Sequence, residues 1–155
     1  MDQDAFRSTY RTYNERGCVY EKAILTNHCG CSRARKFCIA EREGVHCGSE
    51  PGHAACEELL GLLRAEARFA LKATADRSAL PHAKAMRVQV GGLRGIEAVL
   101  HPDRPVPAKI ADIRGTVEAA IARFGSLAAL PFGEIIRQVA AFRGRERRRR
   151  RTPAD

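Results

Sequence analysis

Residues 54–73, AACEELLGLLRAEARFALKA, carry the strongest secondary-structure signal in the chain. Apolar residues recur through this stretch at spacings of three and four, which is the period of one face of an α-helix. Glu57 and Glu58 lie in the first turn, where the helix dipole favours negative charge. The stretch therefore predicts a long amphipathic helix in a mainly helical domain.

Further helices are expected on both sides of this stretch, and glycines mark their ends. They run over residues 4–16, 33–43, 110–124 and 131–143. Residues 82–100 are ambiguous, because Met86, Val88 and Val90 alternate like a strand. No partner strand is evident, so we expect a helix. Its glycines, which weaken a helix, then mark close packing between helices or a turn.

The fold class that follows is mainly α, a single helical domain of five or six helices with a Cys-rich N-terminal loop region. The domain spans residues 1–143, its Cys-rich region residues 17–56, and a basic disordered tail residues 144–155. The 155 residues are enough for one domain with a hydrophobic core. With 6% aromatic residues and no Trp, that core must consist of small aliphatic side chains.

The start of the chain, MDQD, is acidic, and neither a signal peptide nor a membrane-spanning run of apolar residues is evident. We therefore expect a cytoplasmic protein. All six cysteines fall between residues 18 and 56. In a reducing compartment such clustering favours metal ligation over disulfides, although a metal-free thiol-redox protein is an alternative.

Five of the cysteines are candidate metal ligands. Cys29 and Cys31 flank a glycine in a polar loop that could direct both sulfurs at one centre, and Cys47 also precedes a glycine. Cys18 follows Gly17 at a predicted helix end and ranks next. Cys56 begins the 54–73 helix, whose dipole favours a bound anion, and is the reserve fourth ligand. Cys38 is expected to be a buried core residue of the 33–43 helix.

The spacing of the cysteines does not identify the metal. The paired Cys-x2-Cys elements of zinc ribbons and the spacings of common ferredoxins are both absent. Several thiolates with no clear histidine partner favour an iron–sulfur cluster, with Zn2+ as the alternative. His28, His46 and His53 lie in the same region, either as contributors to the site or as solvent-facing loop residues.

The tail from Arg145 to Arg151 holds six arginines and one glutamate. It could contact nucleic acid through phosphates, but we favour a solvated tail because no aromatic residues interleave the arginines. No catalytic motif for acyl transfer, phosphate binding or metalloproteolysis is present, so we expect no enzymatic activity from the chain alone.

The sequence thus predicts a small iron–sulfur protein that acts in electron transfer or as an accessory subunit of a larger redox protein or complex. The alternatives are a zinc-stabilised binding module with an Arg-rich, nucleic-acid-contacting tail, and a metal-free thiol-redox protein.

Overall fold

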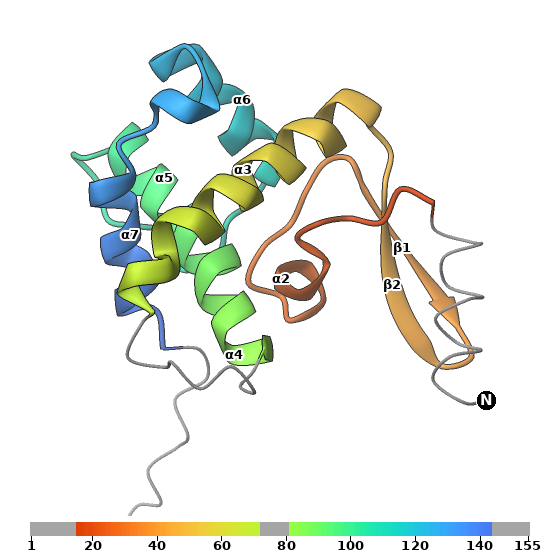
Figure 1. Cartoon of the computed structure of the whole chain (residues 1–155). Helices are drawn as coiled ribbons and strands as arrows, with labels where there is room; N and C mark the ends of the chain where they lie inside the picture. The colour runs from red at the N-terminus through yellow and green to blue at the C-terminus, as the bar shows by residue number, and fades with distance from the viewer. Residues whose placement is uncertain (1–14, 72–80, 144–155) are drawn as a thin grey trace, which may run out of the picture.

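A computed structural model describes residues 15–71 and 81–143, and most of this part of the chain is helical (Figure 1). The helix predicted over 54–73 is confirmed as α3 (Glu50–Ala70), which begins four residues earlier. Leu59, Leu63 and Ala67, each four residues after the last, are buried along it. Helix α3 therefore forms one wall of the core, as its period predicts.

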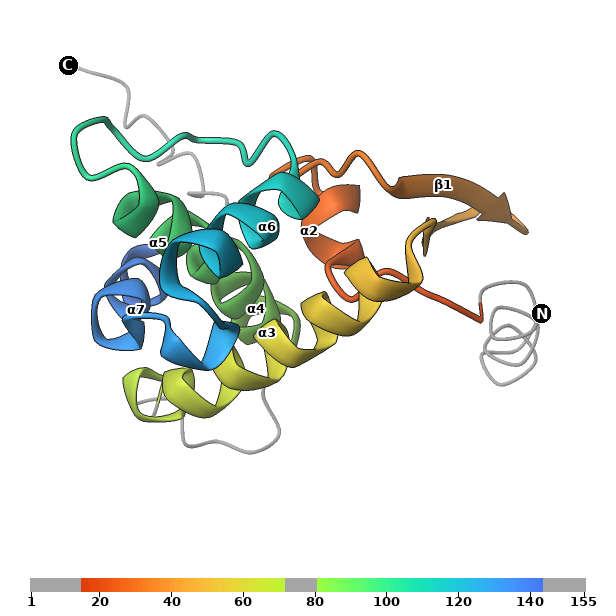
Figure 2. The same ribbon diagram turned by 90° about the horizontal axis from the view of Figure 1, so that it is seen from above.

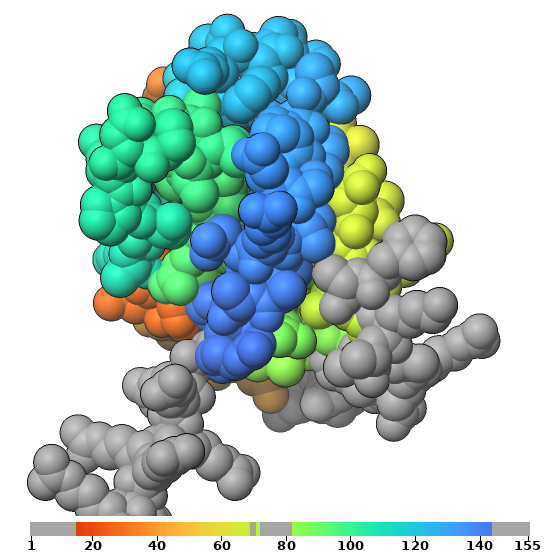
Figure 3. Space-filling model, turned by 90° about the vertical axis from the view of Figure 1, so that its left-hand side faces the viewer, coloured from red at the N-terminus to blue at the C-terminus, as the bar shows by residue number. Residues whose placement is uncertain are grey.

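The C-terminal half packs against this wall. Residues 81–100 form α4 (Pro81–Met86), the π-helix η2 (Arg87–Gly91) and α5 (Gly92–Leu100), which confirms the expectation of a helix there. Helix α6 (Ile113–Phe124), the 3-10 turn η3 (Leu127–Ala129) and α7 (Phe132–Ala141) follow. Helix α7 contacts both α5 and α3, and Figure 3 shows it at the surface of the molecule between them.

The glycines of residues 91–95 allow this close packing. A Cβ atom added to Gly91 would lie 2.6 Å from Cα of Val139, and one added to Gly95 would lie 2.5 Å from the carbonyl oxygen of Ile135. Both atoms belong to the backbone of α7, which cannot move aside without separating the helices. The glycines therefore mark close helix packing, one of the two interpretations that the sequence allowed.

The predicted helix over residues 33–43 is wrong. This stretch is a hairpin of two antiparallel strands, β1 (Ala34–Ile39) and β2 (Arg42–Cys47), with Ile39 opposite Arg42. The two turn residues, Ala40 and Glu41, have φ angles of 49° and 69°. A two-residue turn with both φ angles positive suits a hairpin, but Asn and Gly are its usual residues, so the sequence lacked the usual signal. Figure 2 shows the hairpin extending away from the helices.

A short helix, α2 (Glu21–Leu25), lies between the hairpin and the helical body (Figures 1 and 2). The backbone N–H of Val45 donates to Oε1 of Glu21 at 2.8 Å. The N–H of Ala23 donates to Oε1 of the buried Gln89 at 3.3 Å. Helix α2 therefore joins the Cys-rich segment to the C-terminal helices.

Two predictions fall largely outside the described residues, namely the helix over residues 4–16 and the tail over residues 144–155. Within the part that is described, no helix combines the length and the apolar character needed to cross a membrane.

Candidate metal centre

Cys18 and Cys47 lie on the same face of a small β structure. Gly17 forms an antiparallel bridge with His46, so that the N–H of Cys18 donates to the carbonyl of Val45 at 2.9 Å. Cys18 is therefore directly opposite Val45, and opposite residues of an antiparallel pair share one face. Cys47, two residues after Val45, shares that face as well. Val45 and Cys47 are both buried, so this face is turned inward.

The start of α3 brings Cys56 to this face. The hydroxyl of Ser49 accepts a hydrogen bond from the N–H of Gly52 at 3.0 Å, which caps the helix. Nε2 of His53 lies 2.9 Å from the carbonyl oxygen of Gly17, and this contact holds the first turn of α3 against the segment that carries Cys18. Because Cys56 follows His53 by three residues, it lies on the same side of the helix.

Cys31 arrives from the turn before β1. Its carbonyl accepts from the N–H of Ala34 at 3.1 Å, and Ala34 is paired with Cys47 in the hairpin. Gly30 is held by Ile110, whose carbonyl accepts its N–H at 2.8 Å. A Cβ at Gly30 would be only 2.9 Å from the carbonyl oxygen of Ala111, so the close approach of the two segments requires a glycine here.

The electrostatics of the thiols links these four cysteines. Burial raises the pKa of Cys18 from 9.0 to about 12; the N–H of Tyr20 opposes this change, and the negative charges of Cys31 and Cys47 add to it. Burial likewise raises the pKa of Cys56 to about 12, with further contributions from Cys18, Cys31 and Cys47. We call Cys18, Cys31, Cys47 and Cys56 the thiol tetrad. All six cysteines of the chain are free thiols.

Four thiols could in principle bind either a single metal ion or an iron–sulfur cluster. Within residues 15–71 and 81–143, however, no group of three or more His, Cys, Asp or Glu side chains is arranged so that it could hold a metal. Zinc, with Zn–S bonds of about 2.3 Å in a tetrahedron, needs sulfur atoms roughly 3.8 Å apart. An iron–sulfur cluster distributes its thiolates over several iron atoms, and four cysteines are its usual ligands. By its chemistry alone, a set of four thiolates therefore matches either a cluster or zinc.

Cys29, ranked first from the sequence, is buried in the hydrophobic core. It is 2% exposed and forms a parallel bridge with Ile110. Burial raises its pKa to about 12, opposed mainly by the positive charge of Arg94; among the cysteines, Cys18 is its largest electrostatic neighbour. Cys31 and Cys47, which add to the raised pKa of Cys18 and Cys56, are not among the largest causes of the shift at Cys29.

Cys38 is not the buried helical residue that the sequence predicted. It lies on β1 and is exposed, because the hairpin carries it away from the core. Cys38 opposes Glu43 near the turn, whereas Cys47 opposes Ala34 at the other end of the hairpin. The prediction failed together with the 33–43 helix on which it depended.

Tyr20 is a member of this site that the sequence analysis missed. Its side chain is fully buried, and its hydroxyl has no hydrogen-bond partner among the described residues. Burial raises its pKa well above the usual value, and the negative charges of Cys56, Cys29 and Cys18 add to this rise. An unsatisfied buried hydroxyl costs about 1–3 kcal/mol. The only signal in the sequence was its position two residues after Cys18.

The three histidines of the region have different environments. His53 contacts Gly17, as described above. His46 is adjacent in sequence to both Val45 and Cys47, so it points to the opposite face of the hairpin from the tetrad. Nδ1 of His28 lies 2.9 Å from the hydroxyl of Thr26, and its ring meets Phe142 edge-on at 5.5 Å. None of these placements gives the tetrad a histidine ligand.

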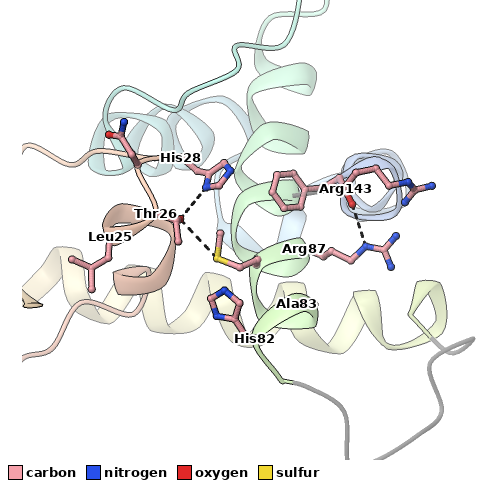
Figure 4. Close-up of a pocket in the computed structure, with 10 residues that line it drawn as sticks. Leu25, Thr26, His28, His82, Ala83, Arg87 and Arg143 are labelled. Carbon is pink, nitrogen blue, oxygen red and sulfur yellow. Dashed lines mark hydrogen bonds between the residues drawn. The ribbon is translucent and has the colours of Figure 1, made fainter. Parts of the chain in front are cut away.

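A separate pocket of about 860 Å3 lies beside α2 and α4 (Figure 4). His28, His82, Arg87 and Arg143 are among its lining residues. The guanidinium groups of Arg87 and Arg143 each donate to the carbonyl of Ala140, near the end of α7. These arginines therefore cap the C-terminal end of α7. No cysteine of the tetrad is among the lining residues of the pocket.

The sequence matches no protein-family model, and searches of curated proteins and of solved structures found no similar protein. The tetrad and its surroundings are thus the basis for any functional conclusion.

Proposed function

We propose that this chain is a small iron–sulfur protein whose cluster is bound by Cys18, Cys31, Cys47 and Cys56. The observation that supports the proposal is that hydrogen bonds bring the segments of Cys18, Cys47 and Cys56 together, while Cys31 and Cys47 add to the raised pKa of both Cys18 and Cys56. Four cysteine thiolates are the usual ligands of such clusters. When bound, the cluster would supply one-electron redox chemistry.

The raised thiol pKa values support metal binding over thiol-redox catalysis. A redox-active cysteine needs a lowered pKa, so that the thiolate forms at neutral pH. Here burial and mutual repulsion keep Cys18 and Cys56 protonated, with pKa values of about 12. Positively charged iron would remove both obstacles, because it displaces the protons and neutralises the repulsion.

The exposure of the tetrad fits a role in electron transfer. Cys18, Cys31 and Cys56 are partly exposed, whereas Cys47 is buried. A centre at this depth would lie near the surface where the hairpin leaves the helical body, within reach of a docked protein. We therefore propose electron transfer, or service as an accessory subunit of a larger redox protein, in the reducing environment that free thiols require.

Substitution of single cysteines tests the ligand set. The protein is purified and reconstituted anaerobically with ferrous iron and sulfide, and bound iron and sulfide are measured with the visible absorption spectrum. Serine at any tetrad position is expected to weaken cluster retention by at least about 100-fold, since even outer-shell changes cost about 10- to 100-fold. Cys38→Ser is the matched control, and we expect full retention because Cys38 is exposed on the hairpin.

Cys29→Ser distinguishes the two candidate ligand sets. If the tetrad is correct, this variant keeps its iron and sulfide, although the buried hydroxyl lowers its stability. Loss of the cluster in Cys29→Ser, with retention in Cys18→Ser or Cys56→Ser, would show that the ligands are those ranked first from the sequence. A colourless protein that contains stoichiometric zinc and no sulfide would contradict the proposal altogether and favour the zinc-stabilised module.

A further inference from the structure

Two arginines that line the pocket of about 860 Å3 meet at one carbonyl oxygen near the end of α7. Nη2 of Arg87 and Nη1 of Arg143 both donate to the carbonyl oxygen of Ala140, at 3.2 and 2.8 Å. Because they share this acceptor, the two nitrogen atoms are separated by at most the sum of those distances, about 6 Å. Figure 4 shows both side chains on the same side of the pocket. One edge of the pocket therefore carries two positive charges close together.

No acidic side chain balances these charges. The residues that line the pocket include no Asp or Glu, and within the described part of the chain neither guanidinium group forms an ion pair. A cation at the C-terminal end of a helix is favourable, but a single arginine would be enough for that purpose. Two guanidinium groups at this separation repel each other. A bound anion would remove the repulsion.

Both guanidinium groups keep hydrogen-bond donors for such an anion. Arg87 uses Nε and Nη2, which donate to the carbonyls of Phe142 and Ala140, and Arg143 uses only Nη1. Since a guanidinium group has five N–H bonds, three on Arg87 and four on Arg143 make no hydrogen bond to a described residue. The two hydrogen bonds of Arg87 also fix the plane of its guanidinium group, so its remaining donors are held in place for a ligand.

The rest of the pocket offers apolar surface. Met86 and Phe142 line it and are 6% and 5% exposed, so they belong to the core. Leu25 and Ala83 add further apolar surface. The volume of the pocket lies within the range of about 300–1,000 Å3 that is usual for small-molecule sites. These features together suit a ligand with an anionic head and an apolar body.

We propose that this pocket binds a carboxylate with an apolar chain, of the size of a medium-chain fatty acid. The two arginines bind the carboxylate, and the chain lies against Met86 and Phe142. A carboxylate matches the planar fork of a guanidinium group. A phosphate monoester carries more negative charge, which the carbonyl oxygens at the C-terminal end of α7 disfavour. This inference does not depend on the iron–sulfur proposal.

Isothermal titration calorimetry of the full chain with octanoate, octyl phosphate and octanol tests the proposal. We expect one octanoate to bind per chain, and more tightly than the other two ligands. Arg87→Gln and Arg143→Gln should each weaken octanoate binding by about 10-fold or more and leave octanol binding unchanged, because each removes hydrogen bonds to the charged head only. Arg137→Gln is the matched control. It removes the same charge from an exposed position of α7 that does not line the pocket, so octanoate binding should not change.

Ala83→Trp tests the apolar part of the pocket. Ala83 is exposed on α4 and lines the pocket, so a larger side chain would occupy the pocket without disturbing the core. This variant should lose the binding of both octanoate and octanol, with an unchanged circular dichroism spectrum.

The choice of variants keeps the proposal testable if one of them is unstable. An unfolded variant would lose octanol binding together with octanoate binding. Should this happen with Arg87→Gln, Arg143→Gln decides the question, because Arg143 is exposed and makes a single hydrogen bond through its side chain.

Three results would overturn the proposal. The first is the absence of octanoate binding, and the second is equal octanoate binding by Arg143→Gln and the unaltered protein. The third is tighter binding of octyl phosphate than of octanoate, which would identify a phosphate site. None of these results bears on the iron–sulfur proposal, which the reconstitution with iron and sulfide tests separately.

Discussion

Replacement of Gly95 by alanine should separate α5 from α7. The new Cβ would lie 2.5 Å from the carbonyl oxygen of Ile135 and 2.8 Å from its Cα and Cγ2 atoms. Ordinary contacts begin at 3.4 Å, so the helices must move apart by about 1 Å or strain their backbones. Overpacking of this kind costs about 1–3 kcal/mol, which exceeds the gain of up to about 1 kcal/mol from helix propensity.

Gly61→Ala is the matched control. Gly61 is exposed within α3, and a Cβ there would meet nothing within 4 Å. The same chemical change should therefore stabilise the protein by about 0.5–1 kcal/mol, because alanine loses less backbone entropy in a helix. One substitution thus has opposite signs at two positions, and the reason is a contact that only the tertiary structure creates.

Urea unfolding followed by far-ultraviolet circular dichroism measures both effects. For a chain of this length, each kcal/mol corresponds to roughly 2–4 °C in melting temperature, so thermal unfolding provides a check. We expect Gly95→Ala below the unaltered protein and Gly61→Ala above it, with similar dependence on urea concentration. If Gly95→Ala were as stable as the unaltered protein, the packing of α5 on α7 would not be as close as described.

Two further predictions concern the metal-free protein. Since burial raises the pKa of Cys18, Cys29 and Cys56 from 9.0 to about 12, the folded state keeps protons that the unfolded chain releases. The free energy of unfolding should be constant below about pH 8 and fall from pH 9 to 12, by up to about 1.4 kcal/mol per pH unit for each thiol. Urea unfolding measured from pH 7 to 11 tests this prediction. A free energy of unfolding that does not change over this range would contradict it. Glu41→Gly should raise stability by about 0.5–1 kcal/mol in the same assay, because glycine adopts the φ of 69° at this turn without strain. A loss of stability in this variant would show that the Glu41 side chain matters more than its backbone.

The helices with a clear apolar period were predictable because their signal is local. Leu59, Leu63 and Ala67 lie four residues apart, and the same spacing that predicted α3 decides which of its residues are buried. The glycines at 91 and 95 were also informative, since close helix packing is one of the few reasons for glycine within a helix. These features depend on residues within a few turns of each other.

The hairpin was predicted wrongly because its local signals conflict with its structure. Ala40 and Glu41 favour a helix by propensity, yet both take left-handed backbone conformations in the turn. Strand β2 is held in place by residues 16–18 and by Glu21 of α2, so contacts from outside the hairpin contribute to its stability. Contacts of that kind override local propensity. The buried position predicted for Cys38 was wrong for the same reason, because it depended on the predicted helix.

Composition and position in the sequence determined that the thiols cluster in one third of the chain, and that a helical core supports them. The tertiary structure decided which of the cysteine-bearing segments lie side by side. Gly17 pairs with His46, and His53 ties α3 to that pair, so Cys18 and Cys56 come together although 38 residues separate them. The physical reason is that helix periods act over a few residues, whereas a site of this kind depends on hydrogen bonds between distant segments, and neither spacing nor composition records those.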